Sequence, residues 1–477
     1  AMRLYDRLEE YENSDYYGFH MPGHKRNRGF MDTALPYGID ITEIEGFDDL
    51  HHASGILKEA EERAARVFGA EETHFLVNGS TVGILSGICG CTKRGDKILV
   101  ARHCHKSIYH AMYLNGLTPV YLYPEFDGSR HLNGEIREAD VRAALEREPD
   151  IRAVVIVSPT YDGVVSDREA IAETVHRKGI PLIVDEAHGA HFGFHSYFPR
   201  RANALGADVV IQSLHKTLPS LTQTALLHLN GNLADWDRVR RYLDMLQSSS
   251  PSYVFMASLD ACADMLEKRG TEVFETYVKR LESLRERLGR LKTLKLLETP
   301  HYDKSKLVIS VAGASLGSRE LYFRLLEEYH LQMEMTGGTY VLGITSVADT
   351  EEGFGRLAEA LERIDRELTE EAEKETGGKM GAASTVSGKL PELSQEYLPW
   401  QMEEAEKRLG TEVLSFSRCL GRVTAEYAYL YPPGSPVLVP GERINKDALE
   451  LLAEYERQGF SIEGIQKEGH CRVLKHG

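Results

Sequence analysis

The sequence predicts an α/β protein whose largest part is a mainly parallel sheet of seven strands. Between residues 72 and 230, short apolar segments recur with little alternation of polar and apolar residues, as expected for strands covered on both faces. Helical periodicity between these segments favours right-handed crossover connections, and therefore parallel strands. The polar residues of interest fall mostly just after these strands, at the edge where ligands of open α/β sheets bind.

The expected elements follow in order along the chain. An irregular segment rich in Gly, His and Asp, residues 1–55, precedes a helix at 56–68. The seven expected strands are residues 73–77, 97–101, 118–122, 153–158, 181–185, 209–213 and 223–229. A long helical region at about 255–295 is followed by strand, helix, strand and helix at 306–311, 318–329, 332–344 and 351–368.

This order predicts five parts. They are an N-terminal segment (1–55), a large domain (56–295), a smaller α+β domain (296–368), a linker (369–394) and a C-terminal α+β module (395–477). The linker is indicated by its run of Glu, Lys, Gly, Ala and Ser, a composition typical of mobile connections.

Composition restricts the class of protein. The 477 residues carry 56 basic and 73 acidic side chains, for a formal net charge of −17, and this argues against nucleic-acid binding. No apolar run approaches the roughly 20 residues that span a membrane, and the N-terminus lacks the apolar stretch of a secretory signal. Neither the six cysteines nor the 19 histidines follow a metal-binding pattern, so we expect a cytoplasmic protein without a metal.

Two of the expected strands end in residues that together indicate a cofactor. One ends at Asp185, and the other is followed by Ser213-Leu-His-Lys216. A lysine amine forms a Schiff base with the aldehyde of pyridoxal phosphate (PLP), and a carboxylate beside the ring nitrogen keeps the ring able to accept electrons. Taken alone, Lys216 could be a solvated charge and Asp185 a helix cap. Together they favour PLP, with Lys216 also returning a proton to the substrate carbon.

A phosphate site is predicted where residues 77–83 join a strand to a helix. Gly79 permits a tight turn, Ser80 and Thr81 supply hydroxyls, and the first helical N–H groups point to the same place. Ser213 and His215 reach the phosphate from the turn before Lys216. The alternative is a plain helix N-cap, where Ser and Thr are favoured in any case.

Two histidines are candidates for contact with the cofactor ring. His105, after the strand at 97–101, suits stacking on the ring, and a helix cap is its alternative role. His188, three residues after Asp185, is expected near the ring or beside Asp185, with a structural hydrogen bond as the alternative. Thr160 or Tyr161 lines the pocket unless this Pro- and Gly-containing segment is a simple turn.

These motifs, in this order, resemble the Orn/Lys/Arg decarboxylases, a bacterial PLP-dependent family of fold type I (aspartate aminotransferase-like). The chain is similar to the short members from Gram-positive bacteria, which lack the N-terminal wing domain of the large inducible enzymes. The matching stretches cover nearly the whole chain, at residues 20–25, 48–55, 78–81, 105–107, 159–161, 185–191, 213–216, 248–253, 256–260, 425–427, 431–434 and 440–443.

The resemblance implies a role for each matching residue. Lys216 is implied as the Schiff-base lysine, Asp185 as the partner of the ring nitrogen and His105 as the stacking residue. The implied phosphate ligands are Ser80, Thr81, Ser213 and His215. Ser249, in the turn 248–250, is implied to reach the phosphate of a neighbouring subunit, because family active sites lie at a dimer interface.

The resemblance also implies that the C-terminal module closes the substrate entrance. There Glu442 or Glu426 would meet the cationic end of the substrate, since a buried cation needs an acid; a surface role is the alternative for either residue. Asp162 and Ser435 depart from the pattern of the family, which leaves the identity of the substrate more open than the chemistry.

The expected function is PLP-dependent α-decarboxylation of a basic L-amino acid by a homodimer in polyamine metabolism. Arginine, giving agmatine, is the preferred substrate, and lysine (cadaverine) or ornithine (putrescine) are alternatives. A PLP aminotransferase or lyase is a second hypothesis. Residues 332–343 contain no arginine of the kind aminotransferases commonly use for the α-carboxylate, which counts against it. A third hypothesis is a non-catalytic PLP-binding protein.

Overall fold

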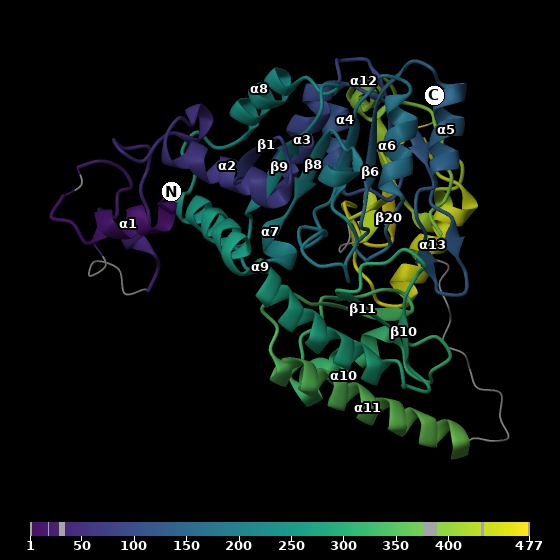
Figure 1. Ribbon diagram of the computed structural model, residues 1–477. Helices are drawn as coiled ribbons and strands as arrows, with labels where there is room; N and C mark the ends of the chain where they lie inside the picture. Colours follow the sequence, from purple (N-terminus) through teal and green to yellow (C-terminus); the bar gives the residue numbers. More distant parts are fainter. Residues whose placement is uncertain (1, 18, 28–33, 375–388, 431–433, 476–477) are drawn as a thin grey trace.

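The computed structural model describes residues 2–17, 19–27, 34–374, 389–430 and 434–475, and it has the expected α/β architecture (Figure 1). Its large sheet has the strand order β1-β9-β8-β7-β6-β2-β3. β9 runs antiparallel to its neighbours β1 and β8, and the other pairs are parallel. All seven expected strands are present, with ends shifted by no more than two residues: β1 (Glu72–Leu76), β2 (Lys97–Ala101), β3 (Thr118–Leu122), β6 (Ile151–Val157), β7 (Leu182–Asp185), β8 (Val209–Gln212) and β9 (Ala225–Leu229).

Helices cover both faces of the large sheet, which explains why its strands are apolar on both sides. One face packs against α3 (Gly79–Cys91), α4 (Lys106–Asn115) and α8 (Trp236–Leu246). The other packs against α5 (Glu138–Arg147) and α6 (Arg168–His176), and near β1 against α2 (Ile56–Phe68). Consecutive strand residues such as Val154 and Val155 therefore belong to different cores.

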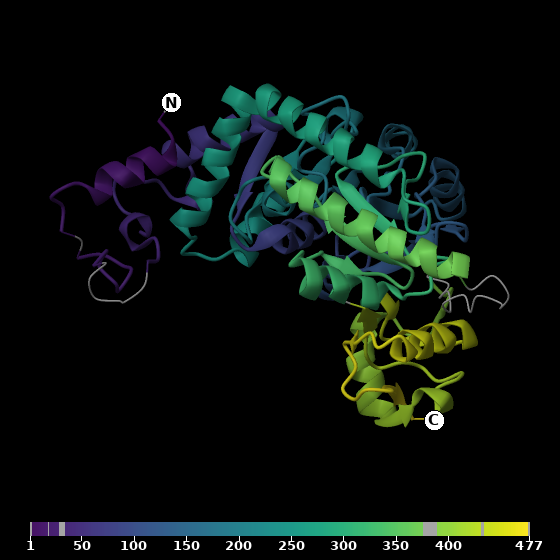
Figure 2. The same cartoon turned by 90° about the horizontal axis from the view of Figure 1, so that it is seen from below.

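A smaller sheet of four strands lies beside the large one, in the order β10-β11-β13-β12. The 36-residue helix α9 (Tyr253–Leu288) connects the two, because its first half packs with α2 and its second half contributes Leu281 and Leu284 to the core under the small sheet (Figure 2). The other elements here are β10 (Lys295–Leu297), β11 (Lys306–Ser310), α10 (Ser318–Tyr329), β12 (Met335–Thr336), β13 (Tyr340–Ile344) and α11 (Glu351–Lys374).

Three expectations about elements were wrong. The single strand expected at 332–344 is the pair β12 and β13, because Gly337 and Gly338 turn the chain between them. The segment 1–55 is not wholly irregular, since α1 (Leu4–Glu12) buries Leu4 and Leu8. Helix α11 continues to Lys374, so residues 369–374 of the expected linker are helical; residues 375–388 lie outside the described part.

The C-terminal module, from β14 to β20, forms a separate lobe against the large sheet (Figure 2). Its own core includes Phe416, Leu438, Leu452 and Val473. Its elements are β14 (Ser394–Gln395), α12 (Met402–Leu409), β15 (Thr411–Ser415), β16 (Ala428–Leu430), β17 (Pro436–Leu438), β18 (Glu442–Arg443), α13 (Lys446–Arg457), β19 (Ile462–Glu463) and β20 (His470–Leu474). Among the described residues, no helix is both long and apolar enough to cross a bilayer.

Candidate active site

A cavity of about 840 Å³ lies at the carboxyl ends of the large-sheet strands, where the small sheet and the C-terminal module meet them. Predicted residues that line it are Ser80, His105, Thr160, Tyr161, Asp185, His188, His215 and Lys216. The small sheet adds Glu334 and Tyr340, and the C-terminal module adds Ser435 and Tyr455. Residues from distant parts of the sequence are therefore gathered around one space.

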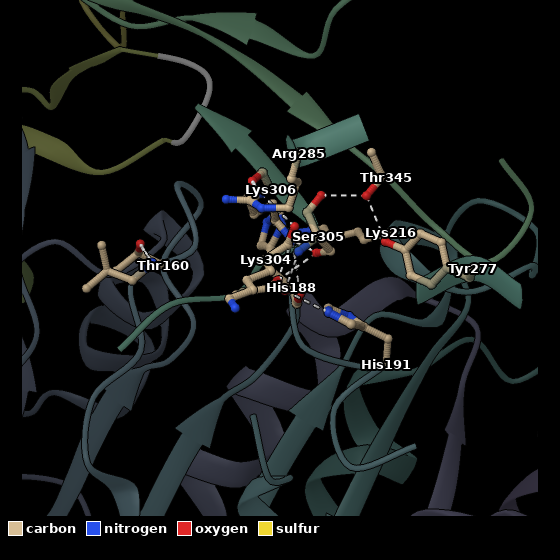
Figure 3. A network of polar contacts seen from close by, with 12 residues as sticks. Thr160, His188, His191, Lys216, Tyr277, Arg285, Lys304, Ser305, Lys306 and Thr345 are labelled. Atoms are coloured by element: carbon tan, nitrogen blue, oxygen red, sulfur yellow. Dashed lines mark hydrogen bonds and ion pairs between the residues drawn. The ribbon is translucent and has the colours of Figure 1, made fainter. Parts of the chain in front are cut away.

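Lys216 lies in the short helix α7 (Leu214–Thr217), directly after β8. Its Nζ is 3.0 Å from Nε2 of His188 (Figure 3). Burial lowers the pKa of Lys216, the nearby Lys306 ammonium lowers it further, and Asp185 opposes the shift. A larger share of the amine is thus uncharged, which is the form that attacks a carbonyl carbon.

Asp185 ends β7 and is 3% exposed. Its Oδ1 accepts a hydrogen bond from the Ala187 N–H at 3.1 Å. Burial raises the pKa of this carboxyl group, although Lys216 opposes the shift. A buried carboxylate is stabilised by a cation at its side, and a protonated ring nitrogen in the cavity meets that requirement.

Both roles foreseen for His105 are compatible with its position. Its Nδ1 accepts from the Ser107 N–H at 3.2 Å and so caps helix α4, while its ring lines the cavity. Burial, and then the charge of Lys216, lowers the pKa of His105 to about 4. The ring is therefore neutral at pH 7, as suits a flat surface stacked on an aromatic cofactor.

The predicted phosphate ligands separate into two groups. Ser80, in the first turn of α3 after Gly79 (φ +71°), and His215 line the cavity. Ser213 is fully buried, and its Oγ has no hydrogen-bond partner among the described residues. Thr81, by contrast, is exposed and is not among the lining residues, so its predicted contact gains no support from the geometry.

These observations show that the residues present fit PLP. The α3 N-terminus with Ser80 offers N–H and hydroxyl groups to a phosphate, and His215 lines the same cavity, whereas the fully buried Ser213 is not among the lining residues. Asp185 suits the ring nitrogen, His105 the ring face, and Lys216 the aldehyde. Each feature of the cofactor therefore has a matching group within one cavity.

One acid at the cavity was not predicted from the sequence. Glu334, just before β12, lines it with an exposed carboxylate that accepts a hydrogen bond from the Tyr161 hydroxyl. The Tyr161 ring lies 4.5 Å from the His188 ring, centroid to centroid. Asp162 also lines the cavity, but its carboxylate accepts a hydrogen bond from the Tyr340 hydroxyl, and burial raises the pKa of Asp162. The Gly337-Gly338 pair was the signal that this segment turns towards the site.

The other predicted contacts lie away from the cavity in this chain. Glu442 is fully buried and paired with Arg102, with Oε2 3.2 Å from Nη2. Glu426 accepts from the Arg472 N–H at 2.8 Å. Ser249 is exposed in a turn whose neighbour Ser248 bonds Asn78 and His51. The substrate role of the two acids and the intersubunit role of Ser249 stay predictions. Residues 431–433 of one motif lie outside the described part.

Comparison of the sequence with known families and proteins gives consistent matches. The model of the Orn/Lys/Arg decarboxylase major domain matches residues 3–322, and that of the C-terminal domain matches residues 385–473. A Bacillus subtilis protein named YaaO, described as uncharacterized, is 36% identical over 99% of this chain and 98% of its own. The arginine decarboxylase of Halalkalibacterium halodurans is 34% identical over 96% and 94%, and that of B. subtilis is 32% identical over 97% and 95%.

Comparison of the structure confirms the fold. The lysine decarboxylase LdcF of Francisella novicida superposes with a TM-score of 0.83 at 20% identity, covering 99% of this chain and 81% of that one. The constitutive lysine decarboxylase of Escherichia coli gives 0.82 at 22%, covering 99% and 82%. An alanine–glyoxylate aminotransferase from Nostoc gives 0.52 at 16%, covering 66% and 88%. The chain has the expected PLP fold type I.

Proposed function

The chain belongs to the Orn/Lys/Arg decarboxylase family of PLP-dependent enzymes, and from this membership we propose that it converts L-arginine to agmatine and CO₂. Arginine is favoured over lysine and ornithine because relatives named arginine decarboxylase align at 31–34% identity over most of the chain. The observation that carries the PLP chemistry is the Lys216 amine, which lies 3.0 Å from Nε2 of His188 in the cavity that Asp185 also lines.

The reaction breaks the bond between Cα and the carboxylate, releases CO₂ and places a proton on Cα. When bound, PLP accepts the electron pair that this cleavage leaves behind. Asp185 keeps the proton on the ring nitrogen, and the neutral His105 ring covers the ring face. Lys216 returns the proton to Cα from its Nζ, and His188, hydrogen-bonded to that atom, is the neighbour that exchanges protons with it.

We assign the recognition of the substrate guanidinium to Glu334. Glu334 is exposed, whereas Asp162 is partly buried and accepts a hydrogen bond from Tyr340, and the Tyr161 hydroxyl orients the Glu334 carboxylate. A guanidinium group can form two parallel hydrogen bonds with one carboxylate, which gives both affinity and orientation. Tyr340 and Tyr455 line the same cavity and supply aromatic surface to it.

The test supplies the PLP-loaded protein with L-arginine, L-lysine or L-ornithine separately, and follows CO₂ and amine. Release of agmatine and CO₂ in equal amounts from arginine, at a kcat/KM at least about tenfold above the other two, is the expected result. Preferred release of cadaverine or putrescine would retain the reaction and change the substrate. Formation of a keto acid with no CO₂ would refute decarboxylation in favour of amino transfer.

A further inference from the structure

A cluster of buried charges lies behind the cavity, and the reaction described above does not use it (Figure 3). Nζ of Lys306 lies 3.0 Å from Oδ2 of Asp303, and neither side chain has any exposed surface. His191 completes the cluster, with Nε2 2.9 Å from Oδ1 of Asp303. Three ionisable side chains thus meet in the interior, next to the loop that follows β7.

The cluster is fully bonded around the carboxylate of Asp303. Ser305 donates to it twice, from its N–H at 3.0 Å and from its hydroxyl at 2.9 Å. Burial alone would raise the pKa of Asp303, but His191 and Lys306 outweigh burial and hold that pKa well below its usual range. Buried ion pairs of this kind seldom stabilise a fold more than apolar side chains of the same volume. Stability alone therefore does not explain the cluster.

The cluster joins the small sheet to the loop that follows β7. Lys306 is the first residue of β11, and its backbone carbonyl accepts a hydrogen bond from Arg285 of α9 at 3.0 Å. On the other side, Nζ of Lys306 donates to the backbone carbonyl of His188 at 3.4 Å. One ammonium group therefore links a rigid strand to the peptide of a residue in the active site.

The contact continues from His188 to the reactive amine. The His188 imidazole is 3.0 Å from Nζ of Lys216, so the residue whose peptide Lys306 holds is also the hydrogen-bond partner of that amine. The titratable groups that act electrostatically on Lys216, or that it acts on, are Asp185, Lys306, Glu334, His188, His105 and His215. Lys306 is the member of this set that has no surface in the cavity.

We propose that Lys306 is a positioning residue. Anchored by Asp303 and His191, it holds the His188 peptide and so fixes the place from which the Lys216 amine attacks the PLP aldehyde. In that attack the amine nitrogen bonds to the aldehyde carbon, and the aldehyde oxygen leaves as water with the two amine hydrogens. The inference rests on the PLP chemistry of the proposed function, but it does not depend on which amino acid is the substrate.

The first readout is the rate at which apoprotein takes up PLP, followed by absorbance after rapid mixing. We expect Lys306→Met to lower this rate constant and kcat by about 10- to 100-fold, the range for small displacements of a reacting group, while KM for the amino acid stays within about twofold. Lys304→Met is the matched control. It removes the same charge from the same turn, but its ammonium lies over the Tyr197 ring, and both readouts should match the wild type.

A double-mutant cycle with His188→Ala tests the route of the effect. If Lys306 acts through the His188 side chain, adding Lys306→Met to His188→Ala slows PLP uptake by no more than about twofold beyond His188→Ala alone. Uptake by Lys306→Met at the wild-type rate, or losses that multiply in the double variant, would overturn the proposal.

A second variant and a comparison with the decarboxylase assay separate the role of Lys306 from misfolding and from the choice of substrate. Should Lys306→Met lack a cooperative thermal transition, Asp303→Asn replaces it in the same cycle. It leaves the lysine in place and removes the anchor of its ammonium, and the same loss of uptake rate is expected. Because PLP uptake needs no amino acid, a protein that shows this pattern but decarboxylates none of the three amino acids would disprove the proposed substrate and leave the role of Lys306 standing.

Discussion

At the scale of single residues, the surroundings of Lys216 set its reactivity. A lysine in water is almost wholly protonated at pH 7 and is a poor nucleophile. Here burial and the Lys306 charge both lower the pKa of the amine, and Asp185 acts in the opposite direction. Burial, and then Lys216, also holds the pKa of His188 well below its ordinary range. The hydrogen bond between the two residues therefore involves a neutral imidazole.

The attachment of PLP to Lys216 gives the first prediction. Reduction of the holoenzyme with borohydride should fix the cofactor on wild-type protein, and mass spectrometry should place the added mass on the peptide that contains Lys216. Lys216→Ala should show no added mass and should lose decarboxylase activity by about 1000-fold or more, as when a covalent catalyst is removed. The exposed Lys178→Ala is the control and should behave like the wild type. Fixation on another lysine in Lys216→Ala with activity retained would contradict the assignment.

Glu334 gives a second prediction at this scale. Glu334→Gln keeps the shape of the side chain and removes its charge, so the guanidinium loses a charged hydrogen-bond acceptor. We expect KM for arginine to rise by about 10- to 100-fold, with kcat within about threefold. Glu327→Gln, an exposed site on α10, should leave both constants unchanged. Steady-state kinetics with arginine decides the matter, and an unchanged KM would transfer the role to another acid, with Asp162→Asn the next variant to measure.

Some site residues were accessible from the sequence because strand geometry brings them together. Asp185 ends β7 and Lys216 comes shortly after β8, and because these strands are parallel neighbours, their carboxyl ends meet at one edge of the sheet. Glu334 lies directly before β12 of the small sheet. The spacing of residues along the sequence does not show that this sheet packs over the large one. The sequence predicted Lys306 as the first residue of a strand. Its burial beside Asp303 depends on how β11 packs against the rest of the protein, and the periodicity of the sequence does not show this packing.

At the scale of elements, the glycines of helix α3 allow it to pack closely against both the large sheet and helix α8. Its residues Gly83 and Gly87 face Ile211 and Val209 of β8, and Gly90 faces Val239 of α8. Spaced by four and then three residues, these glycines lie along one face of α3, and their lack of side chains lets β8 and α8 approach that face closely. The close approach fixes the axis of α3, and with it the direction in which its N-terminus points at the cavity.

A pair of glycine substitutions tests this packing. A methyl group at Gly90 would lie 2.5 Å from Cγ2 and 2.8 Å from Cα of Val239. Gly90→Ala should therefore lower the free energy of unfolding by about 1–3 kcal/mol. Gly270→Ala, in helix α9, would meet nothing within 4 Å, and it should raise the free energy of unfolding by up to about 1 kcal/mol through helix propensity. Urea unfolding of both variants checks the sign, and equal effects would show that packing at Gly90 is loose.

Elements were predicted well where a periodic pattern was long or buried. The strands of the large sheet lack alternation because two helical layers cover them, and this is visible in sequence. Helix α1 was missed because its nine residues bury few side chains, Leu4 and Leu8, among charged ones. The strand expected at 332–344 was drawn too long because β-forming residues flank the Gly337-Gly338 turn on both sides.

At the scale of the whole molecule, one buried cation docks the C-terminal module on the large sheet. Arg102, directly after β2, donates to the backbone carbonyls of Pro436 and Val437 at 2.6 and 3.2 Å. It also pairs with Glu442, and both side chains are only 1% exposed. Because Ser435 and Val437 line the cavity, this docking also sets one of its walls. The module was predicted from the order of elements along the sequence, but nothing in its own spacing indicated this contact.

The docking contact gives a prediction about stability. Glu442→Gln leaves Arg102 charged and buried without an anion, so the free energy of unfolding should fall by about 3–5 kcal/mol. The matched control is Glu396→Gln, which breaks an exposed pair with Arg443 and should leave the free energy of unfolding nearly unchanged. Denaturant unfolding measures both, and limited proteolysis of Glu442→Gln should show earlier cleavage within the module. Equal stability of the two variants would mean that Arg102 is satisfied without Glu442.

The proposal that the active site is shared between two subunits gives the last prediction. The exposed turn 248–250 is held by Asn78 and His51, and we propose that it reaches the cofactor phosphate of a second subunit in a homodimer. Ser249→Asp would then place a negative charge against that phosphate and abolish the activity of the neighbouring site by repulsion, while Lys216→Ala abolishes the activity of the site in its own subunit.

In a mixture of the two inactive proteins, refolded together, half of the dimers are mixed, and each mixed dimer has one intact site of two. Activity should therefore return to about a quarter of the wild-type value. If the turn serves the site of its own chain, each subunit of the mixed dimer carries a defect in its own site, and no activity returns. A chain that carries both substitutions, mixed with Lys216→Ala, is the control that must stay inactive in either case.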